Sequence, residues 1–118
     1  MQKKLVYVCS PLRGNEEYNQ QICREYCKFV CDLGYVPFAP HIFYTQFLLE
    51  ETEEERMRGI NCGIEVLERC DEVWVFTDND EGISEGMRME INVAGKLGIP
   101  CRYLKTTITI DDPICKYI

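Results

Sequence analysis

The chain has 118 residues and a formal net charge of −7, so its length suits one domain with one sizeable core. We therefore expect residues 1–118 to form a single domain. The acidic balance argues against a nucleic-acid backbone or an anionic membrane as the main partner. No signal-peptide pattern follows Met1, and no apolar run approaches membrane length, so we expect a soluble, cytoplasmic protein.

The first part of the chain alternates between strand and helix patterns. Residues 5–9 (LVYVC) are β-branched and aromatic, as in a strand that is buried on both faces. The turn SPLRGN leads to a helix that begins after Asn15 and stops at Gly34. Residues 35–39 (YVPFA) predict a second strand, and Pro37 places it at an edge of the sheet because proline cannot complete a central ladder.

The middle of the chain predicts an aromatic loop, HIFYTQFLLEE, followed by a helix. Thr52 and Glu55 form a capping box that opens this helix. Its inward side is expected to carry Met57, Ile60, Ile64 and Leu67. Gly59 and Gly63 are unfavourable within a helix, but they leave bare backbone that permits close approach by another helix or a ligand.

The last part of the chain predicts a strand, a helix and a further strand. Residues 72–77 and 101–105 have strand character, and the tail after them permits a short fifth strand. Ser84 can cap the intervening helix, which Gly98 ends. The order βαβαβαβ predicts an α/β fold: a three-layer, flavodoxin- or Rossmann-like parallel sheet of four or five strands with helices on both faces.

Glu90 is the most informative residue of the sequence, because it lies within an apolar helical stripe. The members of that stripe are Met87, Ile91, Ala94 and Leu97. A carboxylate on a buried face is unfavourable unless it is paired, protonated or used. The helix starts at the carboxyl end of a parallel strand, where open α/β sheets bind ligands. Glu90 is therefore either a working carboxylate or a side chain that sits at the rim or pairs with Arg or Lys.

The sequence contains none of the usual cofactor fingerprints of such sheets. There is no G-x-G-x-x-G after the first strand and no GxxxxGK[ST]. The eight cysteines include no Cys-x-x-Cys pair. Cys23, Cys27 and Cys31 repeat on one helix and are expected to pack as small hydrophobic residues rather than to bind a metal. We expect neither a cofactor nor a metal.

Three short motifs together resemble the nucleoside 2-deoxyribosyltransferase superfamily, which includes the 2′-deoxynucleoside 5′-phosphate N-hydrolases. They are Cys9-Ser10-Pro11-Leu12-Arg13-Gly14, His41 after the second strand, and Ser84-x-Gly86 with Glu90. The resemblance spans about residues 4 to 105 and is nearest to small phage and bacterial deoxyribosyltransferase-like proteins.

The resemblance implies a reaction at a sugar carbon. In that family a glutamate on the helix after the third strand attacks C1′ while the base departs, and a second base or water resolves the glycosyl-enzyme. Glu90 matches this glutamate. The implied function is cleavage or exchange of the N-glycosidic bond of a (deoxy)nucleoside 5′-phosphate. The alternative is a non-catalytic nucleotide-binding module of the same fold.

The resemblance also implies a phosphate-binding side of the site. Family members that act on 5′-phosphates have a serine six residues before the glutamate, as at Ser84, and those that act on free nucleosides have an aspartate. Arg13 matches a phosphate-side arginine, and Ser10, Gly14 and Gly86 are the other candidate contacts. The alternatives are that Ser84 is only a helix cap and that Arg13 is a solvated loop cation.

One position departs from the family pattern. Relatives carry an aspartate eight residues before the acid at the start of the third strand, and counting back from Asp71 gives Gly63. His41 is the candidate substitute acid, and the alternative is a loop histidine bonded to backbone. Phe43 and Tyr44 are candidates for stacking a base, although aromatic residues beside a core are often part of it.

Relatives in this superfamily are dimers or higher oligomers whose sites borrow residues from a neighbour. We therefore expect a homodimer or higher homo-oligomer that packs through the helices at residues 52–70 and 84–97. Gly59 or Gly63 would then face the partner chain. The expected ligand is a small nucleoside or nucleotide.

Overall fold

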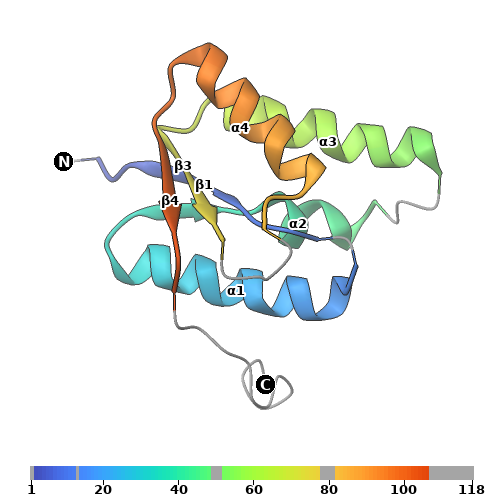
Figure 1. Ribbon diagram of the computed structural model, residues 1–118, viewed down its shortest axis with the longest axis horizontal. Helices are drawn as coiled ribbons and strands as arrows, with labels where there is room; N and C mark the ends of the chain where they lie inside the picture. The colour runs from blue at the N-terminus through green and yellow to red at the C-terminus, as the bar shows by residue number, and fades with distance from the viewer. Residues whose placement is uncertain (1, 13, 49–51, 78–81, 107–118) are drawn as a thin grey trace.

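The computed structural model describes residues 2–12, 14–48, 52–77 and 82–106. Their middle layer is a parallel sheet with the strand order β2-β1-β3-β4 (Figure 1). The strands are β1 (Leu5–Cys9), β2 (Val36–Phe38), β3 (Glu72–Phe76) and β4 (Cys101–Leu104). The predicted parallel α/β fold is confirmed. The predicted fifth strand falls in the tail, outside the described residues.

The strand order places a topological switch point between β1 and β3. From β1 the chain runs outward to β2, which lies at the edge as Pro37 predicted, and then returns across β1 to form β3. The adjacent connections therefore leave β1 and β3 in opposite directions. This reversal opens a crevice beyond the carboxyl ends of the two strands, where ligands of such sheets bind.

Helices cover both faces of the sheet. Helix α1 (Glu16–Asp32) covers one face, whereas α3 (Glu53–Leu67) and α4 (Glu85–Leu97) cover the other (Figure 1). All three begin at the predicted caps: the side chains of Asn15, Thr52 and Ser84 accept hydrogen bonds from backbone N–H groups of the first turn. No described helix has the length and apolar character needed to span a membrane.

Alternate residues of β1 and β3 build two separate cores, as the strand period requires. Val6, Val8, Trp74 and Phe76 pack toward α1. The other core contains Tyr7, Cys9, Val73 and Val75 together with residues of α3 and α4. Tyr7 and Cys9 therefore point to the same side as α4.

Two local expectations were wrong. The aromatic loop is instead a short helix, α2 (Pro40–Phe43), followed by the 3₁₀ turn η1 (Tyr44–Gln46). Proline at the first helical position favours this start. Met57 and Leu97 were expected to face inward, but they are 41% and 51% exposed. Each lies near an end of its helix, and Figure 1 shows the start of α3 extending past the sheet, where no core remains to cover it.

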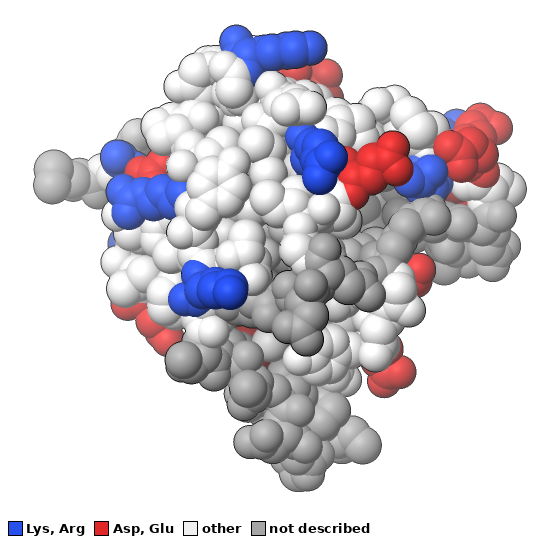
Figure 2. Space-filling view, in the orientation of Figure 1, with Lys and Arg blue, Asp and Glu red and all other residues white. Residues whose placement is uncertain are grey.

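Charged side chains are spread over the side of the molecule drawn in Figures 1 and 2, which shows α1 as well as α3 and α4. Figure 2 shows separate acidic and basic groups on a mostly uncharged surface. Acidic side chains gather at the start of α3, in its first turn, Glu53–Glu55. Their position suits the positive end of the helix dipole.

Gly63 packs against its own chain, so of the two glycines expected to face a partner only Gly59 stays a candidate for that contact. Gly63 is buried, and a Cβ atom at this position would lie 3.2 Å from the Tyr7 hydroxyl oxygen and 3.5 Å from Pro40 Cβ. At Gly63 the close approach predicted for the α3 glycines is thus made by β1 and α2 of the same molecule. The homo-oligomer itself stays a prediction.

Replacing Gly63 with valine tests this packing. The added side chain must displace Tyr7 or Pro40, so the free energy of unfolding should fall by about 1–3 kcal/mol in urea titrations. Gly95→Val is the matched control, because a Cβ there meets nothing within 4 Å. A loss of stability at Gly63 that varied with protein concentration would instead place this glycine at a subunit interface.

Candidate functional site

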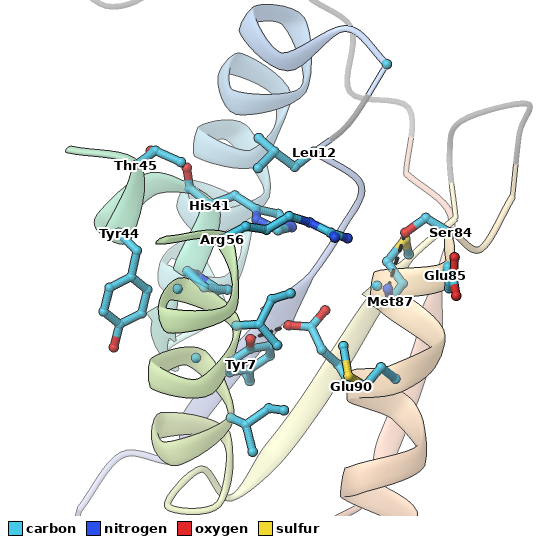
Figure 3. A pocket seen from close by; sticks show the side chains of 18 residues that line it. Tyr7, Leu12, His41, Tyr44, Thr45, Arg56, Ser84, Glu85, Met87 and Glu90 are labelled. Carbon is cyan, nitrogen blue, oxygen red and sulfur yellow. Dashed lines mark hydrogen bonds between the residues drawn. The ribbon is translucent and has the colours of Figure 1, made fainter. Parts of the chain in front are cut away.

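A pocket of about 480 Å³ lies between α3 and α4, over the α4 side of β1 (Figure 3). Strand β1 contributes Tyr7, α2 contributes His41, and the first turns of α4 form the opposite wall. The pocket therefore occupies the crevice that the switch point predicts. It brings together residues that are far apart in the sequence.

Glu90 forms the floor of this pocket. Its helix begins after the Ser84 cap, and Glu90 is only 9% exposed, on the same buried side as Met87 and Ala94. The Tyr7 hydroxyl donates a hydrogen bond to Glu90 Oε2 (Figure 3). The Cys9 thiol lies 3.5 Å from Glu90 Oε1. Both carboxylate oxygens are thus oriented by donors from one strand.

Burial controls the ionisation of these three side chains. Burial raises the pKa of Glu90 from 4.5 to about 7, against the hydrogen bonds from Tyr7 and Cys9, which lower it. The pKa of Tyr7 and that of Cys9 are raised, first by burial and then by the Glu90 charge. Tyr7 and Cys9 therefore keep their protons near neutral pH and remain donors.

None of the ion pairs among the described residues involves Glu90, so the expected alternative of an Arg or Lys partner is not seen there.

His41 lines the pocket as a neutral acceptor. Its Nε2 lies 2.9 Å from the Ser10 carbonyl oxygen, and a carbonyl can only accept, so Nε2 carries the proton. Nδ1 is then unprotonated. Burial lowers the pKa of His41 to about 4. This is the backbone-bonded arrangement that the sequence left open, and a neutral ring is a weak proton donor at neutral pH.

Three further predicted residues line the same pocket. Ser84 and Gly86 do so from the start of α4, and the Ser84 hydroxyl accepts a hydrogen bond from Met87 N at 3.2 Å. Gly14 contributes from the loop after β1, with a φ of 106° that favours glycine. Both the loop after β1 and the start of α4 therefore contribute predicted residues to the pocket.

The remaining predicted residues have different surroundings. Tyr44 lines the pocket, and its hydroxyl donates to the Cys62 carbonyl at 3.3 Å. Phe43 is 52% exposed and packs against Phe38, Tyr44 and Phe47 outside the pocket lining. Ser10 is fully buried and donates its hydroxyl to Cys23 Sγ, so it is not in the lining either. Arg13 lies outside the described residues.

Sequence reasoning missed four polar residues of the pocket, which are Tyr7, Thr45, Arg56 and Glu85. Tyr7 had one usable signal: its hydroxyl sits within a strand that is buried on both faces, and a buried tyrosine usually finds a partner. Arg56 of α3 also lines the pocket. Its only signal was helical spacing, since it lies seven residues before Gly63 on the same side of α3.

Comparison with known proteins places the chain in a family. The model of a family described as Domain of unknown function (DUF7768) matches residues 4–104. The chain belongs to this family. No curated protein matches it by sequence.

Two solved structures share the fold. A 2-deoxyribosyltransferase from Bacillus psychrosaccharolyticus is similar with a TM-score of 0.66 and 21% identity, over 93% of this chain and 78% of the other. A 2-deoxyribosyltransferase from Leishmania mexicana gives a TM-score of 0.63 and 15% identity, over 87% of this chain and 65% of the other. This member of the DUF7768 family therefore has the fold of the 2-deoxyribosyltransferases, as the sequence motifs predicted.

The ionisation of Glu90 predicts how stability depends on pH. Because its folded pKa of about 7 exceeds 4.5, the folded protein binds more protons than the unfolded chain between these pH values, and stability falls as the pH rises. Glutamine cannot titrate. The free energy of unfolding of the wild type, relative to Glu90→Gln, should fall by roughly 2 kcal/mol from about pH 5.5 to about pH 8.

Urea titrations of both proteins at the two pH values measure this difference. Glu85→Gln, on the same helix and exposed, controls for the loss of one charge. A difference between wild type and Glu90→Gln that stayed constant across the range would contradict the burial of this carboxylate.

Proposed function

We propose that this protein cleaves or exchanges the N-glycosidic bond of a (deoxy)nucleoside 5′-phosphate, with Glu90 as the nucleophile. The observation that carries the proposal is a buried carboxylate at the pocket floor whose two oxygens face donors from β1. The shared fold with 2-deoxyribosyltransferases supports it. An oxocarbenium-like transition state at C1′ is stabilised by a carboxylate in this position.

The proposed reaction has two displacements at C1′. The ionised Glu90 carboxylate forms a bond to C1′ as the bond from C1′ to the base nitrogen breaks, and the electron pair of that bond leaves with the base. Water or a second base then attacks C1′, the bond between C1′ and Glu90 breaks to return the carboxylate, and the proton that the attacking group releases balances the proton that the departed base takes up. Tyr7 and Cys9 keep their protons and hold the carboxylate in place throughout. His41 serves as a hydrogen-bond acceptor for the substrate through Nδ1 rather than as the acid.

The 5′-phosphate is proposed to bind at the start of α4. Ser84 and Gly86 line the pocket there, and the first N–H groups of a helix favour an anion. Arg13 is the cation that the resemblance assigns to this phosphate. Glu90 lies less than two turns further along the same helix, so one element positions both ends of the sugar phosphate.

Gly63 favours a second candidate, a nucleotide-binding module without catalysis. Gly63 stands at the position where the nucleoside 2-deoxyribosyltransferase superfamily carries an aspartate. A Cβ atom at this position would lie 3.2 Å from the Tyr7 hydroxyl oxygen. A protein that had lost this acid would keep the pocket and the start of α4. Binding without turnover would be the outcome.

The nucleophile is tested by measuring base release. Wild type and Glu90→Gln would be incubated with ribo- and deoxyribonucleoside 5′-monophosphates, and free base and protein mass would be recorded. Wild type should release base and carry a transient sugar adduct, whereas the Gln variant should lose activity by roughly 10³-fold or more. Glu68→Gln, on the surface after α3, is the control. Normal turnover by the Gln variant would refute the mechanism, and binding without base release would favour the module.

Ser84→Asp separates phosphate binding from helix capping. Aspartate is as good a cap as serine, so α4 should form normally. Its charge should repel a phosphate, so kcat/KM for 5′-monophosphates should fall by about 10-fold or more relative to free nucleosides. Equal effects on both substrate types would leave Ser84 as a cap only.

A further inference from the structure

Arg56 is the long polar side chain on the pocket side of α3. Five α3 residues line the pocket: Arg56, Gly59, Ile60, Gly63 and Ile64. Their spacing is that of one helical face. Two are glycines and two are isoleucines, so Arg56 alone gives this wall a polar group. In Figure 3 its side chain extends from α3 across the pocket opening, above Glu90 and in the direction of Ser84.

The present partner of Arg56 is easily exchanged. Arg56 Nη1 lies 3.3 Å from Glu53 Oε1, three residues earlier on the same helix. The Glu53 side chain is 74% exposed and that of Arg56 is 34% exposed. Exposed pairs of this kind contribute little, because water and salt screen them. A doubly charged ligand in the pocket would compete well for the guanidinium.

The charges of the pocket require a cation for an anionic ligand. The charged carboxylates among its described lining residues are Glu85 and, once ionised, Glu90. His41 is neutral because its pKa is about 4. Of the described lining residues, Arg56 therefore carries the positive charge. A phosphate entering near two carboxylates would be repelled without it.

We propose that Arg56 is a specificity-determining residue that binds the phosphate group of the substrate from the α3 side. The planar guanidinium fork matches phosphate oxygens in pairs, which a lysine cannot do. The inference deepens the proposed function, because it takes the sugar to lie over Glu90 and the phosphate to lie between α3 and the start of α4. It assigns phosphate recognition to two helices rather than to the start of α4 and the loop after β1.

Calorimetric binding of the four 2′-deoxynucleoside 5′-monophosphates and the four matching nucleosides tests this assignment. Arg56→Ala should weaken the monophosphate that binds best by roughly 10- to 100-fold and change nucleoside binding less than about threefold. Arg56→Lys should lose part of this affinity. Arg58→Ala is the matched control, since Arg58 is on the same helix, pairs with Glu54 and is not part of the pocket lining. Thermal melts would verify that each variant folds.

The outcomes separate this inference from the proposed reaction. Three results would each overturn the role of Arg56. In the first, Arg56→Ala weakens the binding of monophosphates and nucleosides equally. In the second, Arg58→Ala loses as much monophosphate affinity as Arg56→Ala, and in the third the wild type does not prefer monophosphates. Base release that depends on Glu90 while Arg56→Ala binds normally would overturn only this inference. Phosphate selectivity through Arg56 without any base release would overturn only the glycosidic reaction.

Discussion

The contact between the Tyr7 hydroxyl and the Glu90 carboxylate holds the centre of this molecule together. It joins the middle strand of the sheet to α4 at a point where a bare carboxylate would be strongly unfavourable. The same hydroxyl lies against the backbone of α3 at Gly63. One side-chain atom thus lies where β1, α3 and α4 meet, and Tyr7 also lines the pocket.

Burial of the Glu90 and His41 side chains determines which groups of the pocket are charged at neutral pH. Glu90 is divided between its charged and neutral forms near pH 7 because burial outweighs two hydrogen bonds. His41 is neutral for the same reason. Besides Glu90, the charged side chains among the described lining residues are Arg56 and Glu85. A ligand with an anionic end near Arg56 and an uncharged body over Glu90 suits this arrangement.

Much of this arrangement could be predicted from the sequence, because local rules decide it. The strands were evident from their β-branched and aromatic runs, the helix starts from Asn15, Thr52 and Ser84, and the edge strand from Pro37. Glu90 was identified because a carboxylate interrupted an apolar stripe. These signals depend on residues that are neighbours in the chain, so they can be recognised without the tertiary structure.

The remaining features depend on contacts between distant residues. Met57 and Leu97 obey helical periodicity, but whether they are covered depends on where the sheet ends. The role of Tyr7 depends on Glu90, 83 residues later. The tautomer of His41 depends on the Ser10 carbonyl, and Arg56 reaches the pocket only because α3 lies beside α4. No local pattern contains this information.

The contact between Gly63 and Tyr7 has an evolutionary consequence. A larger residue at position 63 leaves no room for the hydroxyl at position 7, and a smaller residue at position 7 leaves a gap that position 63 can fill. Substitutions at the two positions should therefore show epistasis, with effects that do not add. Members of the family are expected to change these two residues as a pair, and a change at one alone would disturb the carboxylate that Tyr7 orients.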